Sequence, residues 1–204
     1  MANVLYINSS VRNAGSLSRQ LSAEFIAKWR AANPADNIVE RDLVSDPVPH
    51  LSEQMMGAFF TPAEARNAEQ AHTIKLSDTL VDELVAADVI VLGAPMYNFS
   101  VSSGLKAWID HVLRVGRTFK YGANGPEGLL AGKKVYVFTA SGGVYSEGPA
   151  AGYDFLATYL RTALGFIGLS DVTFVQAEGV AMGEEAVAST LAKGRSKIEA
   201  LIAA

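Results

Sequence analysis

The chain has 204 residues, of which 50% are hydrophobic and 19% charged, and its formal net charge at pH 7 is −4. This length suits one domain over residues 1–204, and the composition excludes a disordered chain. The mild negative charge argues against a basic surface for nucleic acid or membrane. The absence of cysteine excludes disulfides, thiolate metal sites and cysteine nucleophiles. With no signal-peptide profile and no apolar run near the roughly 20 residues of a membrane helix, we expect a cytoplasmic protein.

Apolar runs of strand length alternate with helical apolar stripes along the chain. In chain order, we expect a strand at 4–7, a helix at 17–31, a strand at 37–43, an irregular segment at 43–65, a helix at 65–87, a strand at 89–94, a helix at 102–114, a strand at 133–141, a helix at 153–164, a strand at 171–178 and a helix at 184–203. The run at 89–94 is apolar on both faces, as is typical of a central parallel strand covered by helices. The alternation predicts an α/β fold with a doubly wound, five-stranded parallel sheet and helices on both faces.

One segment interrupts this alternation. Residues 115–132 are longer than a usual connection and contain five glycines. The sequence reads "RTFKY", then Asn124-Gly125-Pro126, then "GLL". It predicts a small protruding hairpin with its turn around those three residues.

The ligand of such a sheet is expected beyond the carboxyl ends of the strands, where the strand order reverses. After the first strand comes "NSSVRNAGSLS", in which Ser16 stands at the N-cap position of the next helix. The hydroxyls of Ser10, Ser16 and Ser18 and the positive end of the helix dipole suit a phosphate. The same serines also fit ordinary capping and turn chemistry. The loop is neither Gly-x-Gly-x-x-Gly nor a Walker sequence, which counts against NAD-type Rossmann and ATP binding.

Two further loops suit a flat ring with polar edges. Pro95 ends the third strand, and the next four residues are Met96, Tyr97, Asn98 and Phe99. After the fourth strand, "TASGGVYSEG" supplies Gly142-Gly143, where the backbone can approach a ligand closely. The alternatives are core packing for the first loop and a plain turn for the second. One phosphate loop and two ring loops together describe a mononucleotide such as FMN. The three histidines show no ligand spacing, so no metal site is expected.

Several segments resemble a known family. "PMYNFSVSSGLKAWID", "RTFKYGANGPEGLLAGKK" and "ALGFIGLSDVTFVQAEG" are similar to the bacterial FMN-dependent NADH-azoreductases, flavodoxin-like homodimers related to the mammalian quinone reductases. The resemblance covers nearly the whole chain. It implies a flavodoxin-like fold and FMN contacts from Ser10, Ser16, Leu17, Ser18, Met96, Tyr97, Asn98, Phe99, Ala140, Ser141, Gly142 and Gly143. The chain departs from the family at Ala140-Ser141, where Ser-Arg is common, so any contact of that arginine is missing.

The resemblance also implies an activity. It is a two-step (ping-pong) reaction in which NADH or NADPH gives a hydride to flavin N5 and a quinone or azo compound then takes the electrons. No catalytic side chain is required. The family's homodimer shares its active site, which the hairpin helps to build, and this makes Phe119 and Tyr121 candidates to cover the flavin or the substrate. Phe60 lies beside Phe59 in an apolar patch of the irregular segment, which is typical of an interface or a pocket wall, and it is a further candidate to contact the substrate. Alternatively, the hairpin aromatics pack within one subunit. The alternative function is a flavodoxin-like electron carrier or a non-enzymatic flavin-binding protein.

Overall fold

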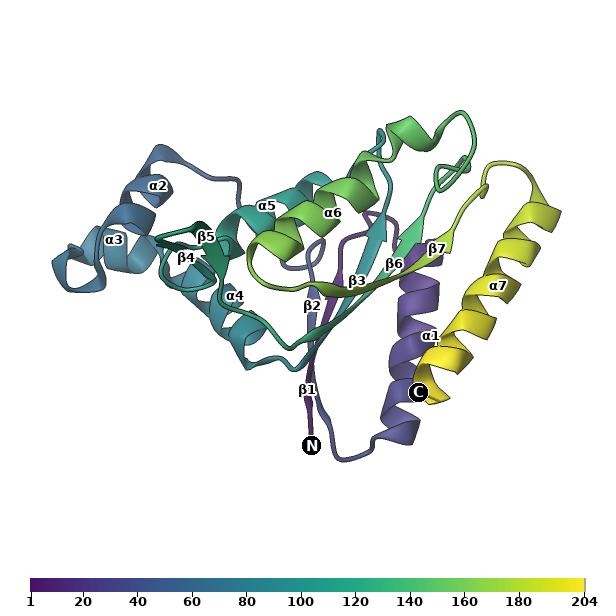
Figure 1. The fold of residues 1–204 in the computed structure, drawn as a ribbon, viewed down its shortest axis with the longest axis horizontal. Coiled ribbons are helices and arrows are strands. Elements are labelled where there is room, and N and C mark those ends of the chain that lie inside the picture. The colour runs from purple at the N-terminus through teal and green to yellow at the C-terminus, as the bar shows by residue number, and fades with distance from the viewer. Residues whose placement is uncertain (204) are drawn as a thin grey trace.

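The computed structural model describes residues 1–203 and has a central sheet of five parallel strands (Figure 1). The strands are β1 (Asn3–Asn8), β2 (Asn37–Asp42), β3 (Val89–Pro95), β6 (Lys134–Ala140) and β7 (Asp171–Ala177). Their order is β2-β1-β3-β6-β7, with every neighbouring pair parallel. The order reverses between β1 and β3, which confirms the predicted doubly wound sheet.

Helices cover both faces of the sheet, as predicted. In Figure 1, α1 (Leu17–Ala32) and α7 (Glu184–Ala203) lie on one face, and α4 (Lys75–Ala86), α5 (Ser103–Val112) and α6 (Phe155–Phe166) lie on the other. Strand residues alternate between the two cores. Ile90 and Leu92 pack on the α4–α5–α6 side, while Val89 and Val91 pack on the α1–α7 side. Every residue of β3 is buried, as expected for a strand covered on both faces.

The segment between β2 and β3 differs from the prediction in two places. Residues 43–65 contain a helix, α2 (Glu53–Phe60), and a short 3-10 helix, η1 (Ala63–Ala65). The Ser52 side chain accepts from the Met55 N–H and starts α2, and the prolines at 49 and 62 confine it to this interval. The predicted helix at 65–87 is two helices, α3 (Ala68–Thr73) and α4, because the Ile74 N–H bonds to the carbonyls of Gln70 and His72 and tightens the turn there.

The predicted hairpin is present as β4 (Phe119–Gly122) and β5 (Gly125–Gly128), which pair antiparallel. Its turn is Ala123-Asn124, whereas we expected it around residues 124–126. Pro126 instead lies in β5 opposite Tyr121, a position that proline tolerates because the strand is at an edge. A second short 3-10 helix, η2 (Ala151–Tyr153), delays the start of α6 to residue 155.

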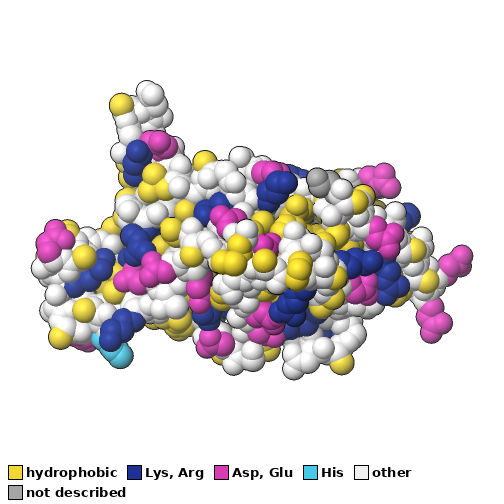
Figure 2. Space-filling view, turned by 90° about the horizontal axis from the view of Figure 1, so that it is seen from below, with side chains coloured by type: hydrophobic (Ala, Val, Ile, Leu, Met, Phe, Trp, Pro, Cys, Tyr) yellow, Lys and Arg dark blue, Asp and Glu magenta, His cyan; other side chains and the backbone are white. Residues whose placement is uncertain are grey.

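The hairpin, α2 and α3 form one end of the molecule, away from the loops that follow β3 and β6 (Figure 1). Figure 2 shows acidic and basic side chains interspersed over one face, without a broad field of one sign. None of the helices formed by residues 1–203 combines the length and the apolar character needed to cross a membrane.

Candidate functional site

The loops after β1, β3 and β6 meet at the carboxyl edge of the sheet and enclose a cavity of about 180 Å³. It lies beside the reversal between β1 and β3, where a ligand was expected. The cavity brings together most of the predicted cofactor residues. Those that line it are Ser10, Ser16, Leu17, Met96, Tyr97, Ala140, Ser141 and Gly142. Ser18, Asn98, Phe99 and Gly143 stand outside this lining.

A network of hydroxyl groups joins the first loop to the second. The Ser16 Oγ donates to the Ser10 Oγ (2.9 Å) and lies 3.2 Å from the Ser18 Oγ. The Ser10 Oγ lies 3.2 Å from the Tyr97 hydroxyl, which comes from the loop after β3. Ser10 and Ser18 are buried. Four hydroxyl groups thus gather at the start of α1, where their protons can turn toward a ligand.

The first loop is held in place by Arg19. Its guanidinium donates to the Ser10 carbonyl from Nε (3.2 Å) and Nη2 (2.8 Å). It also makes a two-pronged ion pair with Asp42, with distances of 2.6 and 2.9 Å. The hydrogen bond from Arg19 is the main cause of a lowered pKa at Asp42. The ion pair therefore ties the serine loop to the end of β2.

The donors at this edge suit an anion. Ser16 is the N-cap of α1, and its hydroxyl accepts from the Arg19 N–H. Within residues 1–203, the backbone N–H groups of Leu17 and Ser18 have no acceptor. The cavity wall includes the cation Arg12 and no carboxylate. Free N–H groups at a helix N-terminus, hydroxyls and a cation are groups that suit a phosphate.

The second loop makes a strained turn. Tyr97 and Ser100 exchange backbone hydrogen bonds (2.9 and 3.1 Å), and the two residues between them have positive φ angles, 48° at Asn98 and 70° at Phe99. Positive φ is costly for a phenylalanine, and such strain clusters at ligand sites. No group in the described chain accepts from the N–H of Asn98 or Phe99. This turn can therefore offer backbone donors to the polar edge of a ring.

The third loop is fixed against the loop after β7. The N–H groups of Gly179, Val180 and Ala181 donate to the carbonyls of Gly143, Ser141 and Gly142 at 3.0–3.1 Å. The Ser141 hydroxyl is buried and donates to the Gly143 carbonyl (2.9 Å). A Cβ at Gly143 would lie 3.2 Å from the Tyr145 ring. The glycine at this position therefore makes room for the Tyr145 side chain. Val180 also lines the cavity; the carboxyl-end rule applied to the fifth strand would have identified it.

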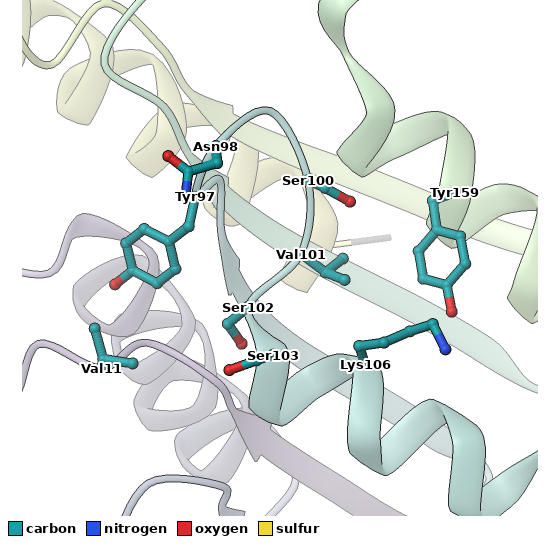
Figure 3. A pocket seen from close by; sticks show the side chains of 9 residues that line it. All are labelled: Val11, Tyr97, Asn98, Ser100, Val101, Ser102, Ser103, Lys106 and Tyr159. Carbon is teal, nitrogen blue, oxygen red and sulfur yellow. The ribbon is translucent and has the colours of Figure 1, made fainter. Parts of the chain in front are cut away.

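A larger cavity, of about 600 Å³, lies on the α5 side of the Tyr97 loop. Figure 3 shows Tyr97 and Val11 at one side of it and Lys106 and Tyr159 at the other, with the serines of residues 100–103 between them. Burial, and then the Asp110 carboxylate, raise the pKa of Tyr159 to about 12. Its hydroxyl therefore remains a hydrogen-bond donor at neutral pH.

Exposed aromatic rings stand beside the second and third loops. The Phe99 ring is 46% exposed, and its centroid lies 6.1 Å from Tyr145 and 5.7 Å from Tyr153. Tyr145 was expected only as a residue that could flank the ligand of the third loop, and Tyr153 was not expected at the site. Their signal was an aromatic residue after the Gly-Gly pair and another before the next helix. Exposed rings in contact suit a flat conjugated molecule.

The three predicted substrate residues lie on α2 and the hairpin, at the end of the molecule away from this cavity (Figure 1). Phe60 is 70% exposed and Tyr121 is 72% exposed. Phe119 is buried against Phe166, with the ring centroids 4.7 Å apart, in keeping with hairpin packing inside one subunit. None of the three approaches the cavity of the same chain.

No group of three or more potential metal ligands occurs in the part of the chain that the structure describes. His111 is buried, with its Nε2 3.0 Å from the Pro49 carbonyl oxygen. Burial is the main cause of its lowered pKa. His111 is therefore a neutral packing residue between α5 and the segment before α2.

Comparison with known proteins gives consistent relatives. A family described as having a flavodoxin-like fold matches residues 2–202. The chain is 62% identical to an FMN-dependent NADH:quinone oxidoreductase of Herminiimonas arsenicoxydans, over 100% of both chains. It is 52% identical to a protein of the same name from Azotobacter vinelandii, over 97% of this chain and 98% of the relative. The crystal structure of an azoreductase from Bacillus anthracis superposes with a TM-score of 0.92 at 30% identity, covering 99% of each chain.

Proposed function

The chain belongs to the family of proteins with a flavodoxin-like fold, and on that premise we propose that residues 1–204 act as one domain and as an FMN-dependent NADH:quinone oxidoreductase that also reduces azo compounds. The observation that carries this proposal is the cavity at the β1–β3 reversal, where the serine loop and both ring loops meet. It supplies a phosphate site and, next to it, a ring site, which is what one FMN requires. The match to the Herminiimonas protein covers the whole chain and therefore includes all three loops.

The donors in this cavity fit FMN. The phosphate would be held by the hydroxyls of Ser10, Ser16 and Ser18 and by the free N–H groups at the start of α1. The ring would lie between the Met96–Phe99 turn and residues 140–143, with the N–H groups of Asn98 and Phe99 at its polar edge. The departure at Ala140-Ser141 removes a cation, yet the Ser141 hydroxyl is occupied within its own loop. The third loop thus keeps its shape without an arginine.

When bound, FMN would supply the redox chemistry, a two-step (ping-pong) hydride transfer through its N5 from NADH to a quinone or azo acceptor. The protein would bind and orient FMN and its substrates and shield them from water. The free backbone N–H groups of Asn98 and Phe99 in the strained turn would stabilise negative charge at the polar edge of a bound ring. Phe99, which contacts Tyr145 and Tyr153, would offer aromatic surface to flat, electron-poor quinones and azo compounds. No side chain needs to act as an acid or base, because solvent can supply the protons.

The positions of Phe60 and Tyr121 favour a homodimer with a shared active site. Both rings are largely exposed and lie far from the cavity of their own chain. They can cover a substrate only at the cavity of a second copy. Light scattering measures the oligomeric state, and a Tyr121→Ala variant tests the sharing. We expect the native protein to be a dimer. We expect Tyr121→Ala to have a higher KM for the acceptor and the same affinity for FMN.

The decisive test of the proposed function is a spectrum of the protein with FMN, followed by anaerobic addition of NADH. We expect a bound-flavin spectrum that bleaches with NADH and recovers with a benzoquinone or an azo dye. A flavin that binds but does not bleach would favour the electron carrier or flavin-binding protein. Failure to bind flavin would overturn the site. The net charge of only −4 argues against a carrier, which needs a strongly acidic docking face, and the face shown in Figure 2 carries interspersed charges of both signs.

Asp42 links the phosphate loop to acid stability. The pKa of Asp42 is lowered in the folded protein, chiefly by the hydrogen bond from Arg19. A carboxyl with a lowered folded pKa adds stability above its unfolded pKa, about 3.9, and that stability is lost as the pH falls through the folded value. We expect Asp42→Asn to lower unfolding free energy at pH 6 by at most about 1 kcal/mol, because the pair is partly exposed. The difference from the native protein should shrink as the pH falls below about 3.9 and through the lower pKa of the folded state.

Urea unfolding of the native protein and of Asp42→Asn at pH 6 and at pH 3 measures this effect. Asp42→Asn should also bind FMN several-fold more weakly, because Arg19 no longer fixes Ser10. The matched control is Asp171→Asn, which alters an exposed carboxylate that pairs with no described cation. A constant difference between Asp42→Asn and the native protein at both pH values would contradict the role of the ion pair.

A further inference from the structure

The carboxylate of Glu178 holds the far part of the loop after β6. Its Oε1 accepts from the backbone N–H of Tyr145 (2.7 Å) and from that of Ser146 (2.8 Å). Its Oε2 accepts from the Ser146 hydroxyl. Three donors of one loop thus converge on a single half-buried carboxylate, and hydrogen bonds to an ionised acceptor are stronger than neutral ones. Glu178 does not itself line the flavin cavity.

Glu178 is fixed in turn by the elements behind it. It is the first residue after β7, and its backbone N–H donates to the hydroxyl of Thr190 (3.1 Å), a buried residue of α7. The next residues, 179–181, donate backbone N–H groups to the carbonyls of residues 141–143 at 3.0–3.1 Å. The carboxylate therefore projects from a well-anchored base formed by the end of β7 and by α7.

These hydrogen bonds divide the loop after β6 into two parts. The backbone bonds from the loop after β7 hold residues 141–143, which include part of the wall of the flavin cavity. The Glu178 side chain holds only residues 145 and 146, which lie outside that wall. Loss of the carboxylate should therefore release residues 145 and 146 and leave the wall of the flavin cavity in place.

The Tyr145 ring connects this carboxylate to the second loop. It meets the Phe99 ring edge-on, with the centroids 6.1 Å apart and an interplanar angle of 81°. Phe99 has a φ angle of 70°, which is costly for a residue with a Cβ, so contacts from outside the turn must maintain it. The Tyr145 ring supplies one such contact, and its own backbone is held by Glu178.

We propose that Glu178 is a positioning residue for the electron acceptor. It fixes the Tyr145 backbone, the Tyr145 ring supports Phe99, and Phe99 offers its exposed ring to a flat quinone or azo compound. This inference rests on the proposed function and names the part of the chain that sets the affinity for the acceptor. Glu178 acts through the hydrogen bonds that it accepts and transfers no proton.

The first test compares Glu178→Ala with the native protein, both loaded with FMN. We expect the KM for a benzoquinone to rise about five- to tenfold because Phe99 is less well held, while kcat and the Kd for FMN change by less than about twofold. Glu178→Gln should stay within about threefold of the native KM, because its amide oxygen accepts the same two N–H groups and its amide nitrogen donates to the Ser146 hydroxyl. The matched control is Glu147→Ala, which removes an exposed carboxylate of the same loop and should leave the KM unchanged.

A double variant separates positioning from a general loss of stability. Tyr145→Ala should raise the KM for the benzoquinone at least as much as Glu178→Ala does, because it removes the ring itself. The variant that combines both changes should have the KM of Tyr145→Ala alone, since the effects of residues that act as one unit do not add. If Glu178 had only a structural role, the two effects would multiply.

Hydrogen exchange tests the contact itself in the protein without flavin. The amides of Tyr145 and Ser146 lie at or near the surface, so their protection depends on the Glu178 carboxylate. In Glu178→Ala they should exchange at least about tenfold faster than in the native protein, and in Glu178→Gln at nearly the native rate. If Glu178→Ala does not fold, Glu178→Asp takes its place in every comparison, because its shorter side chain withdraws the carboxylate from both amides.

The proposal is overturned if Glu178→Ala keeps the native KM, if its effect multiplies with that of Tyr145→Ala, or if the two amides exchange at the native rate. It is also overturned if the Kd for FMN rises as much as the KM, since Glu178 would then act in flavin binding. A native protein that neither binds FMN nor oxidises NADH refutes the proposed function and this inference with it. Failure of this inference alone leaves the turnover of the native protein intact, so the two failures are distinguishable.

Discussion

Replacing Leu17 with proline should leave the fold intact and weaken FMN binding by about 10- to 100-fold. Leu17 is the first residue of α1, where proline is favoured because its fixed φ suits the helix and its missing N–H has no helical partner. Ser16 before it has φ −88° and ψ 111°, the extended conformation that a following proline requires. The substitution therefore deletes one N–H donor that would face the phosphate. Hydrogen bonds to charged groups are worth about 1.5–3 kcal/mol, which gives the expected loss.

The control is Leu17→Ala, which removes the same side-chain packing against the α1–α7 core and keeps the N–H group. Quenching of flavin fluorescence measures the Kd for both variants, and circular dichroism and thermal melting establish that α1 is intact. Equal FMN affinities for Leu17→Pro and Leu17→Ala would show that the start of α1 does not bind the phosphate. Riboflavin, which lacks the phosphate, should bind both variants equally.

The sheet could be predicted from the sequence because its signals are local and strong. The run at 89–94 is apolar on both faces, and the Leu17–Leu21–Phe25 stripe faces one core. The predicted element boundaries are wrong where helix caps or tertiary contacts determine where an element begins or ends. α2 has only eight residues and depends on the Ser52 cap, and the break at Ile74 depends on hydrogen bonds that a continuous apolar stripe does not reveal. The hairpin turn was misplaced because Pro126 was taken as a turn residue, while the strand edge tolerates it.

The cofactor residues could be predicted because parallel strands bring their carboxyl ends to one edge, whatever their separation in the chain. Ser10, Met96 and Ser141 meet there for that reason. The residues that hold the site in place could not be predicted in the same way. Arg19 donates to the Ser10 carbonyl and is itself held by the ion pair with Asp42 at the end of β2. No spacing in the sequence indicates that these three residues meet. The strain at Asn98 and Phe99 was also hidden, since phenylalanine is not a residue from which positive φ is expected.

Replacing Gly128 with alanine should lower the unfolding free energy by about 3 kcal/mol or more and the melting temperature by about 6–12 °C. Gly128 ends β5 where the hairpin meets the turn after α6. A Cβ there would lie 2.1 Å from the Gly168 nitrogen and 2.3 Å from the Ile167 carbonyl carbon. Both are backbone atoms, so no change of rotamer relieves the overlap. The hairpin must shift, which breaks the Leu130 N–H to Ile167 carbonyl bond (2.9 Å).

The matched control is Gly122→Ala in the same hairpin, where a Cβ would meet no atom closer than 3.6 Å and the stability should change by less than about 0.5 kcal/mol. The shift of the hairpin in Gly128→Ala would also move Tyr121, so the two glycine variants should differ in their kinetics. If Tyr121 covers the substrate of a second copy, Gly128→Ala should raise the KM for a quinone and leave the FMN Kd unchanged, whereas Gly122→Ala should alter neither. If Gly128→Ala had the same melting temperature as the native protein, β5 would not pack against residues 167–168. The placement of Tyr121 at a shared site would then lose its structural support.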